Sequence, residues 1–229
     1  MNQSAENDLA FLRSKLLEMG SVSEELVRDA VCALTQQDAA LAGKVISDDD
    51  VVDELESEIE SLCLRLMAKP LAASDFRLVG AALKSITDIE RLGDHAVDIA
   101  RVAQRMQQGM IYKPLVDIPQ MGESVCRIFR ATLNAFVSRD STLASAMLAT
   151  EKQFDTLCRR TQAELQMAMS RDASSVSQAS HLLFIVHYME RIGDHCTNIA
   201  ERVSFIETGQ RQKGHRKTLS CDPPETVEA

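Results

Sequence analysis

The chain carries one phrase twice, as ERLGDHAVDIA at residues 90–100 and as ERIGDHCTNIA at residues 190–200. Seven of the eleven positions are identical, and both copies lie inside an otherwise apolar pattern. Similarity at a fixed separation is the mark of a structural unit that occurs more than once in a chain. The phrase therefore predicts two copies of one unit, each about a hundred residues long.

The composition around the phrase favours helices. Aromatic residues make up only 4% of the 229 residues, and there are nine glycines and five prolines. Ala, Leu, Met, Glu, Gln and Arg, which are good helix formers, are abundant. Strand-rich proteins need more aromatic and β-branched runs and more turn residues. We expect an all-α fold.

The breaks in the apolar pattern predict six helices. Asp38 and Asp140 are expected N-caps, and Lys69-Pro70 is expected to end the second helix because proline cannot continue one. Long helices joined by short loops pack antiparallel into bundles. The helices are expected at about residues 8–34, 38–68, 74–110, 119–138, 140–170 and 172–209.

The six helices form two equivalent sets of three, so the fold class is two tandem three-helix bundles. Residues 38–55 align with the second copy at an offset of 102, and Glu90 to Ile99 align at an offset of 100. We expect the first bundle over residues 1–112 and the second over residues 113–209. The polar segment 210–229, which contains Pro-Pro, is expected to be a disordered tail.

Charge and hydropathy exclude several classes of protein. The net charge is −9 and no Lys/Arg cluster stands out, which disfavours nucleic-acid binding and adsorption to anionic membranes. No apolar run approaches the roughly 20 residues that span a bilayer, and the N-terminus does not resemble a secretion signal. Six scattered cysteines without a CxxC pair are typical of a reducing compartment. We expect a cytoplasmic protein that neither binds nucleic acid nor inserts into membranes.

The acidic residues of the repeated phrase lie on the apolar face of their helix. Val79, Leu83, Ile86, Glu90 and Asp94 are three or four residues apart and therefore share one face. Neighbouring carboxylates repel each other, and burial raises that cost. Metal ions with a preference for oxygen ligands would neutralise such a cluster. The alternative is that these acids are solvated and paired with Arg91, Arg191 or lysines.

The doubled phrase, in a chain of this length and helix content, resembles the PhoU family of phosphate-transport accessory proteins and phosphate-signalling regulators. The resemblance covers roughly residues 8 to 209. It implies acidic motifs on two helices of each bundle, which hold metal clusters in some members. All eight implied metal-binding positions keep a carboxylate: Asp49, Asp53, Glu90 and Asp94 in the first repeat, and Glu151, Asp155, Glu190 and Asp194 in the second.

The resemblance also implies a function without catalysis. It predicts a homodimer that represses phosphate uptake and the phosphate-starvation response. The implied partners are the ATPase subunit of the phosphate ABC transporter and a phosphate-responsive sensor histidine kinase. The implied cofactors are divalent or trivalent metal ions, among them Fe, Mn, Mg and Zn.

Other interpretations stay open on the residues alone. A di-iron carboxylate oxidase is disfavoured because such bundles use Glu-x-x-His, whereas here the next histidine follows each Glu by five residues. A helical scaffold without metal is a third interpretation. We expect His95 and His195 to bond a neighbouring helix or face the surface, and Asp98 and Asn198 to be auxiliary ligands or groups that orient the ligands.

Overall fold

The computed structural model describes residues 3–106 and 117–210, and its secondary structure there is almost entirely helical. The first repeat contains three long helical segments, the second of which is divided in two, and the second repeat contains three helices and a short 3₁₀ turn. The elements are α1 (Gln3–Gln36), α2 (Ala39–Asp48), α3 (Asp50–Met67), α4 (Ala73–Arg105), α5 (Asp117–Ser138), α6 (Ser141–Arg171), η2 (Ala173–Ser175) and α7 (Val176–Thr208). The all-α prediction is confirmed.

The second predicted helix is interrupted at Asp49, between α2 and α3. Asp49 keeps a right-handed helical backbone, and its carbonyl accepts a bond from Val52 N at 2.8 Å as well as from Asp53 N at 3.3 Å. Three aspartates occur in succession at 48–50. Aspartate is a weak helix former because its side chain competes for backbone groups. The interruption is therefore local and leaves the axis of the helix continuous.

The turns before α2 and α6 are built alike. Asp38 caps α2 by accepting hydrogen bonds from Ala40 N and Leu41 N, both at 3.0 Å. Asp140 caps α6 by accepting from Leu143 N at 2.9 Å. The preceding residues, at 37 and 139, both have positive φ, at 55° and 60°. The predicted caps are confirmed, and the turn geometry repeats at the same offset as the sequence.

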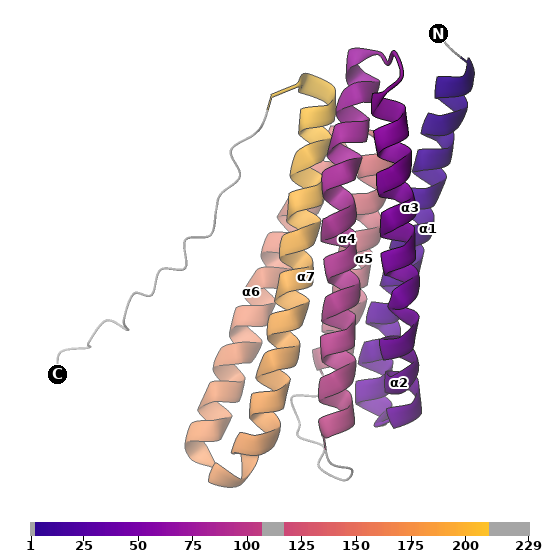
Figure 1. The fold of residues 1–229 in the computed structure, drawn as a ribbon. Helices are drawn as coiled ribbons and strands as arrows, with labels where there is room; N and C mark the ends of the chain where they lie inside the picture. Colours follow the sequence, from indigo (N-terminus) through magenta and orange to yellow (C-terminus); the bar gives the residue numbers. More distant parts are fainter. Residues whose placement is uncertain (1–2, 107–116, 211–229) are drawn as a thin grey trace, which may run out of the picture.

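The two repeats lie side by side (Figure 1). Helix α4 of the first repeat packs against α7 of the second, and α1 packs against α5. Figure 1 shows α4 and α7 adjacent, with α3 and α1 beyond α4 and α6 beyond α7. The buried apolar side chains of both repeats belong to one continuous cluster. The contact between the repeats is therefore part of the core.

Contacts between the repeats are reciprocal. A Cβ on Gly20 of α1 would lie 2.1 Å from Cδ2 of Leu133 on α5. A Cβ on Gly122 of α5 would lie 2.9 Å from Cγ2 of Val31 on α1. Gly122 and Leu133 are the residues 102 positions after Gly20 and Val31. When residue i contacts j and the counterpart of i contacts the counterpart of j, the units are related by a two-fold axis.

Polar bonds join the repeats at one end of the bundle. Arg139 Nη2, in the turn before α6, donates to Asp75 Oδ1 of α4 at 2.6 Å. Arg77 donates to the carbonyls of Ile206 and Glu207 near the end of α7, at 2.8 and 3.1 Å. Backbone carbonyls in the last turn of a helix have no partner within it, so Arg77 caps α7 from the other repeat.

Within 3–106 and 117–210, no helix has the length and apolarity needed to cross a membrane. The predicted boundary at 112/113 falls in 107–116, outside the described residues. All but Gln210 of the predicted tail also lies outside them. The limits of the domains and the disorder of the tail stay predictions.

Candidate functional site

The four candidate acids of the first repeat face each other between two helical segments. Asp49 lies between α2 and α3, Asp53 follows in the first turn of α3, and Glu90 and Asp94 lie on α4. A Cβ on Gly93 would be 2.5 Å from Asp49 Oδ1, so the glycine leaves the space that the carboxylate fills. The structure therefore brings this predicted set together.

The electrostatics of this first carboxylate cluster disfavour full ionisation. Burial, followed by the charges of Asp53 and Asp94, raises the pKa of Asp49 to about 6. Burial and the charge of Asp94 raise the pKa of Glu90 to about 7, with Arg91 acting in the opposite direction. A pKa raised by burial and by like charges means that the site favours an added positive charge.

Glu90 also has an oxygen without a hydrogen bond. Its Oε2 atom is buried and accepts no hydrogen bond from the described residues, although Arg91 Nε lies 3.4 Å away. A buried carboxylate oxygen without a donor is costly unless something positive approaches it. This atom and the raised pKa values fit an oxygen-preferring metal ion.

Two more acids border the first cluster. Glu56 on α3 accepts a bond from Thr87 Oγ1 at 3.0 Å, and its charge contributes to the raised pKa of Glu90. Asp98 lies one turn beyond Asp94 on α4, and burial raises its pKa despite Arg101, whose Nη1 lies 3.7 Å from Asp98 Oδ1. The first cluster thus extends over more than one helical turn, and Asp98 is part of it.

The second carboxylate cluster lies between α6 and α7. Glu151 and Asp155 on α6 are buried, at 6% and 3% exposure. A Cβ on Gly193, between Glu190 and Asp194 on α7, would be 3.6 Å from Glu151 Oε1. The structure therefore brings Glu151 against the segment of α7 that carries the other two acids.

Protein donors already occupy much of the second cluster. Arg159 forms an ion pair with Asp155, and Arg191 Nη1 lies 2.9 Å from Asp194 Oδ2. Gln162 Nε2 donates to Glu190 Oε2 at 3.1 Å. The expected pairing of acids with arginine is thus present in both clusters, since Arg91 of the first cluster pairs with Glu90 and Asp94.

In the described ranges, no three His, Cys, Asp or Glu side chains surround a common point at metal-ligand distances. Carboxylates repel one another when no cation lies between them. The donor set is nevertheless carboxylate oxygen in both clusters, which suits hard ions such as Mg²⁺, Mn²⁺ and oxidised iron.

The two histidines of the repeated phrase lie where α4 meets α7, and His95 Nδ1 is also 3.9 Å from Asp98 Oδ2 at the border of the first cluster. His195 Nδ1 donates to Asp88 Oδ1 on α4 at 2.8 Å, as a bond to a neighbouring helix was predicted. The ring of His95 stacks on Tyr188 of α7, with centroids 5.8 Å apart. Burial, then the positive charges of His195 and Arg191, lower the pKa of His95 to about 4. Both histidines therefore serve the contact between the repeats.

Asp88 is a buried residue that the pattern of the sequence did not reveal. It accepts a bond from Asn198 Nδ2 at 2.9 Å and pairs with Arg202, which also reaches Ser85. Burial opposes its ionisation, but the bond from His195 and the charge of Arg202 hold its pKa below the usual value. Asn198 is therefore a partner of Asp88. Only a comparison of α4 with a helix far along the chain could have found this network.

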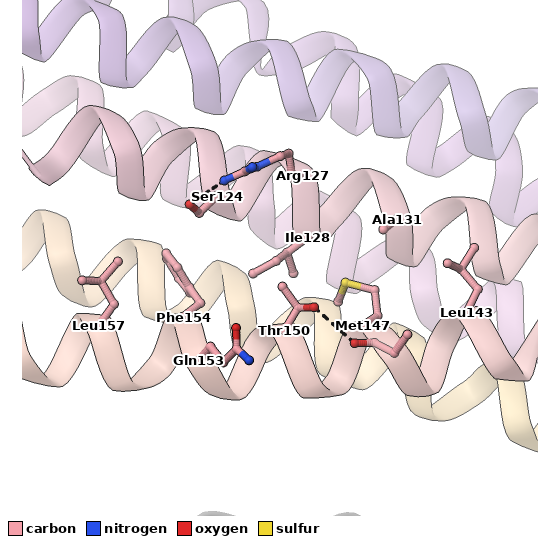
Figure 2. Close-up of a pocket in the computed structure, with 11 residues that line it drawn as sticks. Ser124, Arg127, Ile128, Ala131, Leu143, Met147, Thr150, Gln153, Phe154 and Leu157 are labelled. Carbon is pink, nitrogen blue, oxygen red and sulfur yellow. Dashed lines mark hydrogen bonds between the residues drawn. The ribbon is translucent and has the colours of Figure 1, made fainter.

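An apolar groove lies between α5 and α6 in the second repeat (Figure 2). Its volume is about 440 Å³. Leu143, Met147 and Phe154 rise from α6 toward Ile128 of α5, and Arg127 lies at the edge, where it donates to Ser124 Oγ at 3.1 Å. At the equivalent place in the first repeat, Lys44 of α2 lies 3.6 Å from Asp29 of α1. Alanines stand at the two corresponding positions, 131 and 146.

Comparison with known proteins gives matches to both repeats. A family model described as "PhoU domain" matches residues 16–103 and again residues 118–203. The Clostridium acetobutylicum protein named "Phosphate-specific transport system accessory protein PhoU homolog" is 38% identical over 208 residues, covering 90% of this chain and 95% of the relative. A Pseudomonas aeruginosa protein of the same name is 35% identical over 211 residues, covering 91% and 87%.

Two crystal structures have the same fold. PhoU from Pseudomonas aeruginosa superposes with a TM-score of 0.84 at 34% identity, covering 90% of this chain and 99% of that one. The phosphate transport system regulatory protein PhoU from Streptococcus pneumoniae superposes with a TM-score of 0.85 at 27% identity, covering 92% and 100%. The similarity extends over both repeats.

Proposed function

The chain belongs to the PhoU family, and from that membership we propose that it regulates phosphate uptake as an accessory protein of a phosphate-specific transport system. The observation that carries the proposal is the match to accessory proteins of that name over nine-tenths of the chain. The Streptococcus pneumoniae structure carries the description of a regulatory protein. Because relatives are named for accessory and regulatory roles, we assign this chain a regulatory role without catalysis.

The proposed partners are the ATPase subunit of a phosphate ABC transporter and a phosphate-responsive sensor histidine kinase. The proposed location is the cytoplasmic side of the membrane, where the protein could contact both partners. The proposed assembly is a homodimer. When phosphate is ample, the protein would reduce uptake and keep the starvation response off. A rigid bundle with a net charge of −9 suits docking to other proteins.

The carboxylate clusters are the proposed metal sites. Asp49, Asp53, Glu90 and Asp94 would hold ions in the first repeat. This is supported by the buried Oε2 atom of Glu90, which has no hydrogen bond among the described residues, and by the raised pKa of Glu90. The eight acids would supply only oxygen ligands, and the second set is Glu151, Asp155, Glu190 and Asp194. Bound ions would neutralise the clusters and supply positive charge to which a phosphate oxygen could bind.

The rival function, a di-iron oxidase, gains no support from the donor set. The imidazole of His195 bonds Asp88 outside the clusters. That of His95 stacks on Tyr188 and reaches only Asp98, at the border of the first cluster, at 3.9 Å. Oxygen consumption by iron-loaded protein with a reductant distinguishes the two functions. Turnover would favour the oxidase, and its absence the regulator.

A genetic experiment tests the regulator. In a strain of the source organism that lacks the gene, a reporter of the phosphate-starvation response should stay on in phosphate-rich medium. The wild-type gene should switch it off, and failure of expressed wild-type protein to do so would refute the proposal.

Removal of site acids then tests the metal clusters within that function. The variant replaces Glu90, Asp94, Glu190 and Asp194 with alanine. The control replaces four exposed acids outside the clusters, Glu25, Glu54, Glu123 and Glu164, and so changes the net charge equally. Repression should be lost only in the first variant. Equal repression by both variants would remove the clusters from the mechanism.

A further inference from the structure

The two carboxylate clusters occupy equivalent places in the two repeats but have different surroundings. On the helix that precedes the repeated phrase, Ser57 of the first repeat corresponds to Arg159 of the second. Glu56 corresponds to Cys158 at the same offset. On the helix that carries the phrase, Asp98 corresponds to Asn198. Each of these differences makes the second cluster less negative than the first.

The first cluster has an excess of negative charge. It contains seven carboxylates that influence one another, and two arginines, Arg91 and Arg101, contact them. The carboxylates are those of Asp49, Asp50, Asp53, Glu56, Glu90, Asp94 and Asp98. Their formal charge together with the two arginines is −5. Two divalent ions would neutralise most of it.

The second cluster contains four carboxylates and two arginines, and its formal charge is −2. Asp155 is the more buried acid of its pair, with 4% of its side chain exposed, and Arg159 reaches it from the solvent with 65% exposed. Gln162 adds a hydrogen bond to Glu190, at a position where the first repeat has Glu60. The guanidinium of Arg159 thus already supplies positive charge to the buried carboxylate of Asp155.

We infer that the two sites are unequal: the first takes up divalent metal ions more tightly, and Arg159 competes with metal for Asp155 in the second. This inference rests on the proposed metal sites and adds an order of filling to them. An ion that binds the second cluster must displace the guanidinium from a buried carboxylate. Arg159 is exposed on its other side, so it can move into solvent without disturbing the core.

The expected size of the effect follows from the bond that is lost. A charge-assisted hydrogen bond is stronger than a neutral one, and breaking it to admit an ion reduces the apparent affinity by about tenfold or more. Removal of Arg159 should therefore raise the affinity of the second site for metal by this factor. An arginine introduced at residue 57 should lower the affinity of the first site by a similar factor.

Single-site proteins make the comparison direct. The double variant E90A/D94A leaves only the second site, and E190A/D194A leaves only the first. Both are titrated with Mn²⁺ by calorimetry, and bound manganese is counted after dialysis, with circular dichroism to confirm the helical content. The first site should bind about tenfold or more tightly than the second.

Substitutions of arginine then test the cause. In the protein with only the second site, Arg159→Ser should tighten Mn²⁺ binding by about tenfold. Arg160→Ser is the matched control, because Arg160 is also exposed and lies 3.6 Å from Glu164 on the surface. In the protein with only the first site, Ser57→Arg should weaken binding by a similar factor.

Each outcome is decisive. Tightening by Arg159→Ser but not by Arg160→Ser supports the inference. An equal effect of both substitutions, or of neither, with Mn²⁺ still bound at both sites, overturns the inference and leaves the proposed metal sites standing. No Mn²⁺ at either site in proteins with intact helices overturns the metal sites and the inference together, while regulation of the reporter by the wild-type gene would still stand.

Discussion

His195 Nδ1 lies 2.8 Å from Asp88 Oδ1, and this bond joins the second repeat to a buried carboxylate of the first. The positions are related by the duplication, because the counterpart of His195 is His95 and the counterpart of Asp88 is Tyr188. His95 and Tyr188 are also in contact, as stacked rings. The repeated histidine thus makes the same inter-repeat contact twice, once through charge and once through ring stacking.

Loss of the Asp88 carboxylate should destabilise the protein. Asp88→Ala leaves Arg202 and Asn198 without their shared acceptor, and we expect a loss of about 2–3 kcal/mol in the free energy of unfolding. Chemical denaturation near pH 7 measures it. The pKa of Asp88 is lowered in the folded state, so its contribution is present above its ordinary value near 3.8 and is lost as pH falls through the lowered value.

The expected pH dependence distinguishes this network from a simple packing defect. The difference in free energy of unfolding between the wild type and Asp88→Ala should narrow as the pH falls below about 4. A gap of constant size from pH 7 to pH 3 would contradict the role of the ionised carboxylate.

Gly93→Ala should affect the first carboxylate cluster more than the stability of the fold. The added Cβ would be 2.5 Å from Asp49 Oδ1, so the carboxylate must move. The gain of about 1 kcal/mol in helix propensity offsets much of the strain. We expect a nearly unchanged free energy of unfolding but weaker Mn²⁺ binding at the first site.

The equivalent glycine of the second repeat supplies the control. At Gly193 the nearest atom to an added Cβ is Phe154 Cδ1 at 3.5 Å, which is an ordinary contact. Gly193→Ala should therefore leave Mn²⁺ binding at the second site close to that of the wild type. Equal losses at both sites would show that the close approach of Asp49 has no special effect.

The metal-free protein should lose stability as pH rises through the acidic and neutral range. Glu90 has a pKa of about 7 in the folded state against an ordinary 4.5, so the folded state holds a proton that the unfolded state has released between these values. Stability from this group therefore falls as pH rises from 4.5 to 7. Thermal unfolding in EDTA at several pH values measures it. Glu90→Gln should flatten the slope, and an unchanged slope would contradict the assignment.

Gly20→Ala should weaken the contact between α1 and α5. The new Cβ would lie 2.1 Å from Leu133 Cδ2, and overpacking of this kind costs about 1–3 kcal/mol. Leu133→Ala combined with Gly20→Ala should be less destabilised than the sum of the two single variants. Denaturant titration of all four proteins checks the coupling, and simple additivity would show that the two residues do not clash.

Much of the fold follows from local chemistry in the sequence. Asp38 and Asp140 act as caps where expected, since a cap needs only a side chain and the next few backbone groups. Glu90 and Asp94 share a face because helical spacing requires it. The interruption at Asp49 escaped prediction, although the three successive aspartates at 48–50 are a local signal for it.

The missing parts of the site depend on partners far apart in the chain. Asp88 meets residues more than a hundred positions later, and no local period reveals them. The pairing of Arg159 with Asp155 has a signal in the sequence, but only when the repeats are aligned and Ser57 is seen at the corresponding place. Internal repeats therefore identify shared contacts, and their differences show where the two copies diverge.

The reciprocal packing of Gly20 on Leu133 and of Gly122 on Val31 resembles the interface of a two-fold dimer, yet it lies within one polypeptide. In a dimer of separate identical subunits, every mutation appears twice and both ends remain alike. A fused pair can change one half alone, so Arg159 could arise without an arginine at residue 57. The molecule thereby acquires a direction: a partner that approaches it meets two halves of different charge, and one orientation of docking is preferred over its reverse.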